Sequence, residues 1–480
     1  MDFLHPYFLH LVILVLSLFL IFLVYFKHNK SPHVKLPPGT KGWPFLGESL
    51  AFLMTARRGH PEKFVKDRVK KYSPDVFQTS LLGENMAVFC GASGNKLLFT
   101  SENKYVKAWW PKSLLKAFIV PDPDEFSYKE VSTSWRRILT EFLKPEALQR
   151  SIPVMDSMAR EHLKTDWCPW KELKVFPLVR KYTFALACRL FMSIRDPNLV
   201  SKLSGPYALV TSGMLSVPIY FPGTPYYKAI KASKVITKDL LEIMNRRRME
   251  LSENKDITSP DVLTRVLLHK EDDGRSMSDA GIYNRIMGLL IASHDTISTT
   301  ITFMFKCLVE HPHVYTRVFK EQMEIAKSKF PEELLNWEDI QKMKYTWCVA
   351  CETMRLFPPS QGAFREAITD FTYAGFTIPK GWKTFWTVHS THKNPKYFPD
   401  PEKFDPSRFE GDGPAPYTFV PFGGGPVMCP GKEYARLEIL IFMHNVVTRF
   451  KWKKAAEGEK IIFDPAPIPV NGLPVHLEPL

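Results

Sequence analysis

Amphipathic helices account for most of the hydrophobic pattern along the chain. Apolar residues recur every three or four positions, with polar residues between them, which is the spacing of one helical face. Examples of such stretches are 62–71, 147–164 and 227–251. A longer and more apolar helix is predicted at 279–311, and another at 432–449. These patterns predict a mainly α-helical body.

Strand-like runs are few and short. They occur at 87–90, 371–378 and 384–388, and the last two flank the turn sequence Pro379-Lys380-Gly381, which predicts a hairpin. Prolines are dense between 395 and 430, so this stretch is predicted to be a meandering loop without helix. The expected fold class is mainly α with a small β portion.

The N-terminal region carries a long apolar run. It extends from 6 to 26 with almost no charge, and about twenty residues suffice to cross a bilayer. Lysines follow it from position 27 onward, which places the body on the cytosolic side. A cleaved signal peptide is the alternative, but it would carry positive charge before the apolar run. The sequence predicts a single-pass membrane anchor at 1–30, a Pro-rich hinge at 31–45 and one domain at 46–480.

Composition narrows the class of partner. The 480 residues are 45% hydrophobic and 24% charged, which excludes a disordered or fibrous chain. Seven cysteines imply no disulfide framework. The net charge of +14 predicts an anionic neighbour, either membrane lipid or an acidic protein. We expect no nucleic-acid partner, because no lysine or arginine tract resembles a nucleic-acid-binding arm. The apolar stretch 217–222 is open to two interpretations, a loop that dips into the membrane or a buried one.

A glycine-rich segment at 421–431 holds the most distinctive chemistry. Three consecutive glycines let the backbone pass close to something flat and bulky, and Cys429 follows them just before the predicted helix 432–449. Free N–H groups at a helix N-terminus stabilise thiolate, and a thiolate ligand to haem iron favours O–O cleavage. Phosphate binding is the alternative, but no Gly-Lys-Ser/Thr ending and no preceding strand support it.

These residues resemble a known signature. Phe422, Gly425, Cys429 and Gly431 are similar to the haem-ligand motif of the cytochrome P450 superfamily, the haem-thiolate monooxygenases. The resemblance implies the cytochrome P450 fold, haem with Cys429 as its axial iron ligand, and O2 and NADPH as co-substrates. It also implies NADPH–cytochrome P450 reductase as partner and the endoplasmic reticulum membrane as location.

Two further segments agree with this resemblance. Glu352 and Arg355 are three residues apart on a predicted helix, so they share one face and can pair. They resemble the family's Glu-x-x-Arg motif, and Arg408 resembles the arginine that joins it. The resemblance implies a structural triad that braces the haem side of the core. Taken alone, the pair would be an ordinary solvated one.

The helix 279–311 contains a polar interruption. Asp295 and Thr296 resemble the family's oxygen-activation segment, which implies that they relay protons as catalytic residues. Hydroxyls in mid-helix can bond to carbonyls one turn back and loosen the helix locally. Ser293 stands where the family usually has glycine, a departure that could narrow the helix groove but leaves the acid–alcohol pair intact.

Val427 is the larger departure, because the family usually has there an arginine that binds a haem propionate. Losing one charge-assisted hydrogen bond costs about 1.5–3 kcal/mol. The resemblance offers Arg365 and Arg136 as other propionate ligands, and we expect haem to bind more weakly than usual. Cys348 and Cys351 imitate a redox motif, but no βαβ pattern or second ligand pair surrounds them. Helix-core cysteines are the preferred interpretation.

The likeness to plant triterpenoid oxidases covers nearly the whole body. Its segments lie at 42–48, 108–111, 142–149, 336–339, 364–370 and 432–439. The resemblance implies a pentacyclic triterpene substrate of the β-amyrin, α-amyrin or lupeol type, with oxidation at C-28 through alcohol and aldehyde to acid. Motif position alone suggests pocket residues, for which core packing is an equal alternative; these are Trp109, Trp110, Met214, Leu215, Leu290, Ala292 and Phe364.

Three other functions stay open at this level. The first is hydroxylation of another ring position of a triterpenoid. The second is a haem-binding protein without oxygenase activity, for which Val427 is the only support. The third, an oxygen-independent isomerase on the same fold, is disfavoured because Asp295 and Thr296 are both present.

Overall fold

A computed structural model describes most of the chain. The described residues are 10, 12–17, 19–20, 34–43, 46–111, 115–116, 119, 128–167, 172–214, 216–253, 260–270 and 274–480. Most of the predicted anchor at 1–30 and the first residues of the predicted hinge lie outside this part. Leu215 also lies outside it. Within it, no helix is both long and apolar enough to span a membrane.

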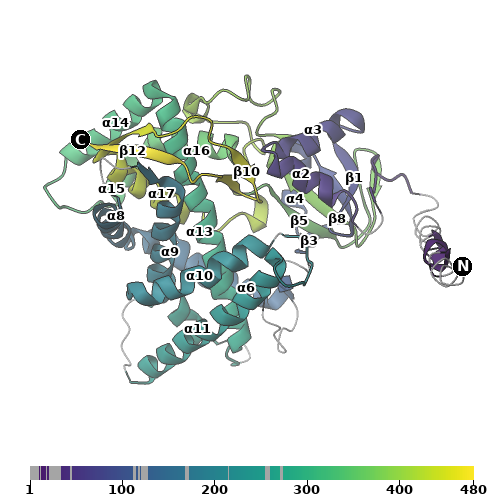
Figure 1. The fold of residues 1–480 in the computed structure, drawn as a ribbon, viewed down its shortest axis with the longest axis horizontal. Coiled ribbons are helices and arrows are strands. Elements are labelled where there is room, and N and C mark those ends of the chain that lie inside the picture. Colours follow the sequence, from purple (N-terminus) through teal and green to yellow (C-terminus); the bar gives the residue numbers. More distant parts are fainter. Residues whose placement is uncertain are drawn as a thin grey trace, which may run out of the picture.

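Helices dominate the body, as the hydrophobic pattern predicts (Figure 1). They are α2 (Ser49–Arg57), α3 (Pro61–Lys71), α4 (Gly91–Thr100), α6 (Tyr128–Leu143), α7 (Pro145–Gln149), α8 (Ile152–Asp166), α9 (Val175–Met192), α10 (Pro197–Met214), α11 (Pro225–Glu253), α12 (Val262–Leu268), α13 (Asp279–Glu310), α14 (Pro312–Lys327), α15 (Trp337–Lys342), α16 (Lys344–Leu356) and α17 (Lys432–Val447). The 32-residue helix α13 runs through the middle of the helical part.

The sheets are small and lie at the edges of the helical body. The largest has the order β1 (Val76–Leu81), β2 (Glu84–Phe89), β8 (Lys383–Thr387), β5 (Gly362–Ala367) and β3 (Val106–Ala108), with only β2 and β8 parallel. A second joins β4 (Glu172–Lys174), β12 (Pro474–Pro479) and β9 (Phe450–Lys454). Two hairpins pair β10 (Ile461–Phe463) with β11 (Pro467–Pro469), and β6 (Phe371–Tyr373) with β7 (Phe376–Ile378). Figure 1 shows the five-stranded sheet beside α2, α3 and α4, on the opposite side of the molecule from α8, α14 and α15.

Three element predictions were wrong in detail. The stretch 147–164 is two helices, α7 and α8, because Pro153 starts a new helix more readily than it continues one. The run 371–378 is a hairpin in itself, since Ala374 and Gly375 both adopt positive φ and turn the chain. Consequently 384–388 does not pair with it; β8 pairs with β5 and β2 instead. The proline-rich stretch contains no α-helix, but it does hold two short 3₁₀ turns, at Pro406–Phe409 and Gly425–Val427.

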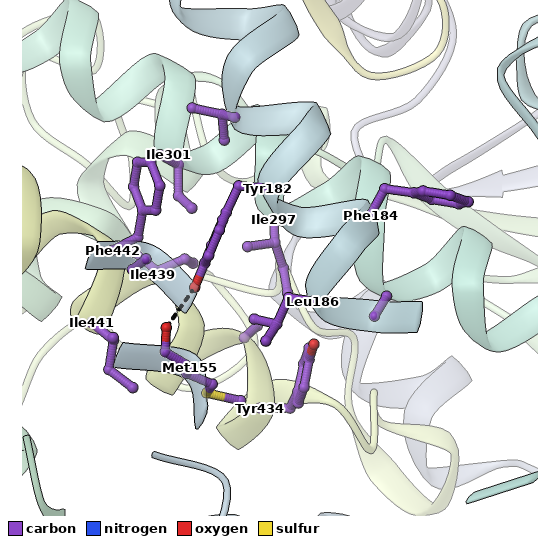
Figure 2. Close-up of a cluster of buried hydrophobic side chains, with 14 of the residues drawn as sticks. Met155, Tyr182, Phe184, Leu186, Ile297, Ile301, Tyr434, Ile439, Ile441 and Phe442 are labelled. Atoms are coloured by element: carbon purple, nitrogen blue, oxygen red, sulfur yellow. Dashed lines mark hydrogen bonds between the residues drawn. The ribbon is translucent and has the colours of Figure 1, made fainter. Parts of the chain in front are cut away.

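The main core forms where α8, α9, α13 and α17 meet. Figure 2 shows part of it, with Tyr182 of α9 packed between Ile297 and Ile301 of α13 and Phe442 of α17. The Tyr182 hydroxyl donates to the carbonyl oxygen of Met155 at 3.3 Å, so even this polar atom is satisfied in the interior. The start of α13 is fixed by Ser278, whose hydroxyl accepts the Gly281 N–H, and Pro312 follows its end. The helix that carries Asp295 thus has both its start and its end defined by the local sequence.

Candidate active site

The glycine-rich loop before α17 is packed against helix α4. Gly425 has a φ of +68°, and a Cβ there would overlap the carbonyl oxygen of Phe99. A Cβ on Gly424 would overlap the Phe99 ring. A larger residue would require a shift of the Phe99 backbone at position 425 and of the Phe99 ring at position 424. The close approach that the sequence predicts is therefore made, within the described protein, to Phe99.

Cys429 stands apart from the other described cysteines. It is exposed, whereas Cys90, Cys188, Cys307, Cys348 and Cys351 are buried. The buried state of Cys348 and Cys351 within α16 agrees with their interpretation as helix-core residues. The Cys429 N–H donates to the Phe422 carbonyl at 2.9 Å, and Phe422 packs against the main core, so the thiol is presented from a fixed loop.

The electrostatics of Cys429 differ from expectation. Desolvation raises the pKa of its thiol above the ordinary value, and the Gly431 N–H at the start of α17 lowers it only in part. The helix terminus alone therefore does not produce a thiolate. A metal ion deprotonates a coordinating thiol outright. Cys429 is an exposed residue on a fixed loop, and a backbone N–H is directed at its sulfur; both features fit an axial haem ligand.

Glu352, Arg355 and Arg408 lie together in the interior. Arg355 donates to both carboxylate oxygens of Glu352, at 2.6 and 2.8 Å. Arg408 approaches the same carboxylate, with its Nε 3.5 Å from Oε1. The Asp405 N–H also donates to Glu352, at 2.8 Å. The three predicted side chains are thus brought together, and they connect α16 to the proline-rich loop.

Asp295 and Thr296 lie near the middle of α13. The Thr296 hydroxyl donates to the Ala292 carbonyl one turn back, at 2.8 Å, as predicted for a mid-helix threonine. The Asp295 carboxylate lies 2.7 Å from the guanidinium of Arg180, on the neighbouring helix α9. Tyr207 of α10 donates to its other oxygen at 3.4 Å. Burial raises the pKa of Asp295 above its usual value, although Arg180 and Tyr207 oppose the rise.

The sequence did not reveal Arg180 and Tyr207 as neighbours of the acid. Both are brought to Asp295 by tertiary packing of α9 and α10 on α13. The one available signal was the charge of Arg180 inside a largely apolar helical stretch.

The two arginines expected near haem propionates have protein partners. Arg136 donates to the carbonyl of Pro426, inside the glycine-rich loop. Arg365 is buried on β5, with its Nε 3.1 Å from the Glu102 carboxylate. A propionate would therefore share Arg365 with Glu102. Val427 ends the 3₁₀ turn of the same loop and is half-buried.

The predicted pocket residues are divided between different environments. The rings of Trp109 and Phe364 meet edge to face with their centroids 5.8 Å apart, and Trp110 and Ala292 are exposed. Met214 is the half-buried last residue of α10. Leu290 is only 1% exposed and belongs to the main core, so its packing there is sufficient explanation for it. Leu215 lies outside the described residues.

A haem-thiolate oxygenase is the class that this loop, helix and buried triad define. The family model described as Cytochrome P450 matches residues 37–475, and the chain belongs to the cytochrome P450 family. This family and fold imply haem iron, with O2 and electrons derived from NADPH. Monooxygenases of this family generally receive those electrons from a redox partner.

Curated relatives match almost from end to end. The chain is 57% identical to a β-amyrin 6-β-monooxygenase of Solanum lycopersicum, over 99% of this chain and 98% of the relative. It is also 57% identical to a β-amyrin 28-monooxygenase of Vitis vinifera, over 98% of each. Among solved structures, a retinoic acid-bound cyanobacterial CYP120A1 matches 93% of this chain and all of its own, with a TM-score of 0.82 and 32% identity.

Proposed function

We propose that this chain oxidises a pentacyclic triterpene of the β-amyrin type, most directly at C-28, through alcohol and aldehyde to the carboxylic acid. One observation carries the proposal: several curated β-amyrin 28-monooxygenases are 53–57% identical to the chain over nearly its full length. The edge-to-face pair Trp109 and Phe364 supplies aromatic, apolar contact area of the kind that a C30 skeleton requires.

Oxidation at a second position of the same skeleton is supported by an equal sequence identity. The relative named β-amyrin 6-β-monooxygenase is as similar to this chain as the grapevine 28-monooxygenase. The two activities differ in which carbon of the substrate faces the reacting centre, so the same sequence motifs are compatible with both. Hydroxylation at the 6β position is therefore the alternative function.

The roles of the site residues follow from their positions. Cys429 would hold haem, which supplies oxygen activation at its iron when bound. The glycine-rich loop keeps the cysteine in place, while Glu352, Arg355 and Arg408 secure the loop that precedes it. Asp295 and Thr296 accept and pass protons on α13.

The cellular setting is part of the same proposal. The apolar run within 1–30 and the lysines after it support a single-pass anchor in the endoplasmic reticulum membrane, with the body in the cytosol. Four exposed apolar residues between α10 and α11 support a further lipid contact; Val217, Ile219, Tyr220 and Phe221 are 46–66% exposed. The net charge of +14 suits docking to an acidic NADPH–cytochrome P450 reductase.

Product analysis tests the proposal. The chain is expressed with a plant reductase in yeast strains that make β-amyrin, α-amyrin or lupeol, and each extract is analysed by mass spectrometry against standards. We expect the C-28 alcohol, aldehyde and acid. A 6β-hydroxylated product would replace the C-28 assignment by the alternative. No product from β-amyrin, α-amyrin or lupeol, despite bound haem, would overturn the substrate class and favour a haem protein without this oxygenase activity.

Two cysteine variants provide a matched control. Cys429→Ser should abolish every product, because the hydroxyl is a poor substitute for a thiolate ligand. Cys348→Ser should retain product, since its sulfur donates to the Phe409 carbonyl and a serine hydroxyl can make the same bond. Equal activity of the two variants would contradict the role of Cys429.

A further inference from the structure

Tyr207 of α10 links three helices around Asp295. Its side chain is only 1% exposed and packs against Phe184 of α9 and His294 of α13, with ring centroids 4.8 and 5.4 Å away. Its hydroxyl lies 3.2 Å from the Leu290 carbonyl oxygen and 3.4 Å from Oδ2 of Asp295. A buried hydroxyl thus reaches both the helix backbone and the acid.

The hydroxyl has one proton and two acceptors. A tyrosine O–H can donate a full hydrogen bond to only one of them at a time. Burial, followed by the nearby Asp295 charge, raises the pKa of Tyr207 well above its usual value, so the phenol keeps its proton. Tyr207 is therefore a donor that changes acceptor, rather than a net source of protons.

The two acceptors respond differently to the state of Asp295. An ionised carboxylate is the stronger acceptor and draws the Tyr207 proton. A protonated carboxyl is a weaker acceptor, which leaves the Leu290 carbonyl as the alternative. The Ser293 hydroxyl donates to the same carbonyl, at 3.3 Å, so the Leu290 oxygen has a second side-chain donor beside Tyr207.

Asp295 is held from two neighbouring helices. Arg180 of α9 contacts Oδ1 at 2.7 Å and Tyr207 of α10 contacts Oδ2. The third facing group is His294, whose Nε2 lies 3.7 Å from Oδ1. Its Nδ1 is 2.6 Å from the Thr183 hydroxyl, and burial lowers the His294 pKa well below its usual value, so the ring is neutral. The carboxylate therefore has one cation and one hydroxyl to orient it.

We propose that Tyr207 is a positioning residue for Asp295, and that it couples the placement of α10 to proton delivery. The inference rests on the proposed proton-relay role of Asp295. Helix α10 ends at Met214, a predicted substrate-pocket residue, so a ligand that displaces this end also moves the hydroxyl. An α10 displaced outward by even one ångström would lengthen a contact that is already 3.4 Å and break it, which would leave Oδ2 of Asp295 without the Tyr207 donor while Arg180 still holds Oδ1.

Tyr207→Phe removes only the hydroxyl, and Tyr182→Phe is the matched control. Tyr182 is equally buried, on α9, and donates to a single carbonyl, that of Met155 (Figure 2). With reductase and β-amyrin, we expect Tyr207→Phe to lower product formed per NADPH by about three- to tenfold, a small part of what a full acid–base group contributes. Tyr182→Phe should leave this ratio unchanged. In an Asp295→Asn background, Tyr207→Phe should have no further effect.

An infrared titration gives a readout that does not depend on turnover. The carboxylic acid band of Asp295 in the haem-loaded protein is identified by its loss in Asp295→Asn. Removing the Tyr207 donor should raise the pKa of Asp295, so this band should persist to higher pH in Tyr207→Phe. An unmoved band, with a product ratio equal to that of Tyr182→Phe, would overturn the positioning role. If Asp295→Asn itself leaves product per NADPH unchanged, the relay role fails and the infrared result alone reports whether Tyr207 binds the acid.

Discussion

Arg355 binds Glu352 through both carboxylate oxygens, and neither side chain is exposed at all. The same guanidinium donates to three carbonyl oxygens beyond β8, those of His392, Pro401 and Lys403. The buried guanidinium of Arg355 therefore hydrogen-bonds to carbonyl groups of a loop that has little regular structure of its own. Because that loop leads to Cys429, we infer that the pair supports the candidate site through the backbone rather than through chemistry.

Breaking this pair should be costly. Glu352→Gln leaves the Arg355 charge buried without a counter-charge, and we expect the free energy of unfolding to fall by about 3–5 kcal/mol. Urea unfolding of the detergent-solubilised chain measures the loss. The control is Glu433→Gln, which breaks a pair of the same spacing, with Arg436, on the partly exposed start of α17. That change should cost at most about 1 kcal/mol. Equal losses would show that the buried pair does not brace the fold.

Gly425→Ala should disturb both the fold and haem binding. The new methyl group would overlap the Phe99 carbonyl and also strain a backbone with φ of +68°. Gly413 has nearly the same φ, +67°, but nothing within 4 Å of the added Cβ. Gly413→Ala should therefore lose only the stability that the left-handed backbone conformation costs an alanine, about 1–2 kcal/mol, and should retain haem. Gly425→Ala should lose about 1–3 kcal/mol more through overpacking, together with most of the haem absorbance. Similar losses for the two variants would exclude a special role for contact with Phe99.

Val427→Arg should strengthen haem binding. An arginine here can supply the charge-assisted hydrogen bond that the chain lacks, worth about 1.5–3 kcal/mol. We expect haem to transfer to an excess of a haem-scavenging apoprotein at least about tenfold more slowly. Val470→Arg adds the same charge at a position that is 52% exposed, near the β10–β11 hairpin, and should not change the rate. An unchanged rate in Val427→Arg would indicate that other groups, such as Arg136, already meet the need.

Interactions between residues close in sequence could be predicted, whereas interactions between distant residues could not. Glu352 and Arg355 could be paired in advance because helix geometry fixes residues three apart. Cys429 could be singled out because its glycines and the helix after it are adjacent in sequence. Tyr207 could not be linked to Asp295, since that contact depends on how α10 packs on α13, 88 residues away. Two turn sequences lie close together here, Ala374-Gly375 and Pro379-Lys380-Gly381. The prediction placed the hairpin turn at the second, whereas the backbone turns at Ala374 and Gly375.

Glu438 makes folding stability depend on pH. It lies on α17 with no exposed surface, and neither carboxyl oxygen meets hydrogen-bond geometry with the described part of the chain. Burial raises the pKa of Glu438 well above its usual value, and the Tyr434 hydroxyl one turn earlier opposes the rise only weakly. The folded chain thus keeps a proton that the unfolded chain releases near an ordinary glutamate pKa. Stability is present below that pKa and is lost as pH rises toward the folded value.

Glu438→Gln should remove this dependence. Relative to wild type, the variant should gain stability progressively from pH 5 to pH 8, by up to about 1.4 kcal/mol per pH unit. Urea unfolding at several pH values measures the difference. Glu48→Gln provides a control of opposite sign. Burial raises the Glu48 pKa, but hydrogen bonds from Arg68 and Thr79 outweigh this effect, and the net pKa is lowered. Because its pKa is lowered, Glu48 stabilises the fold fully at any pH above the ordinary glutamate pKa. Glu48→Gln should therefore be less stable than wild type by the same amount from pH 5 to pH 8. A Glu438→Gln difference that is flat with pH would mean that the buried carboxyl is ionised in the fold and has a partner.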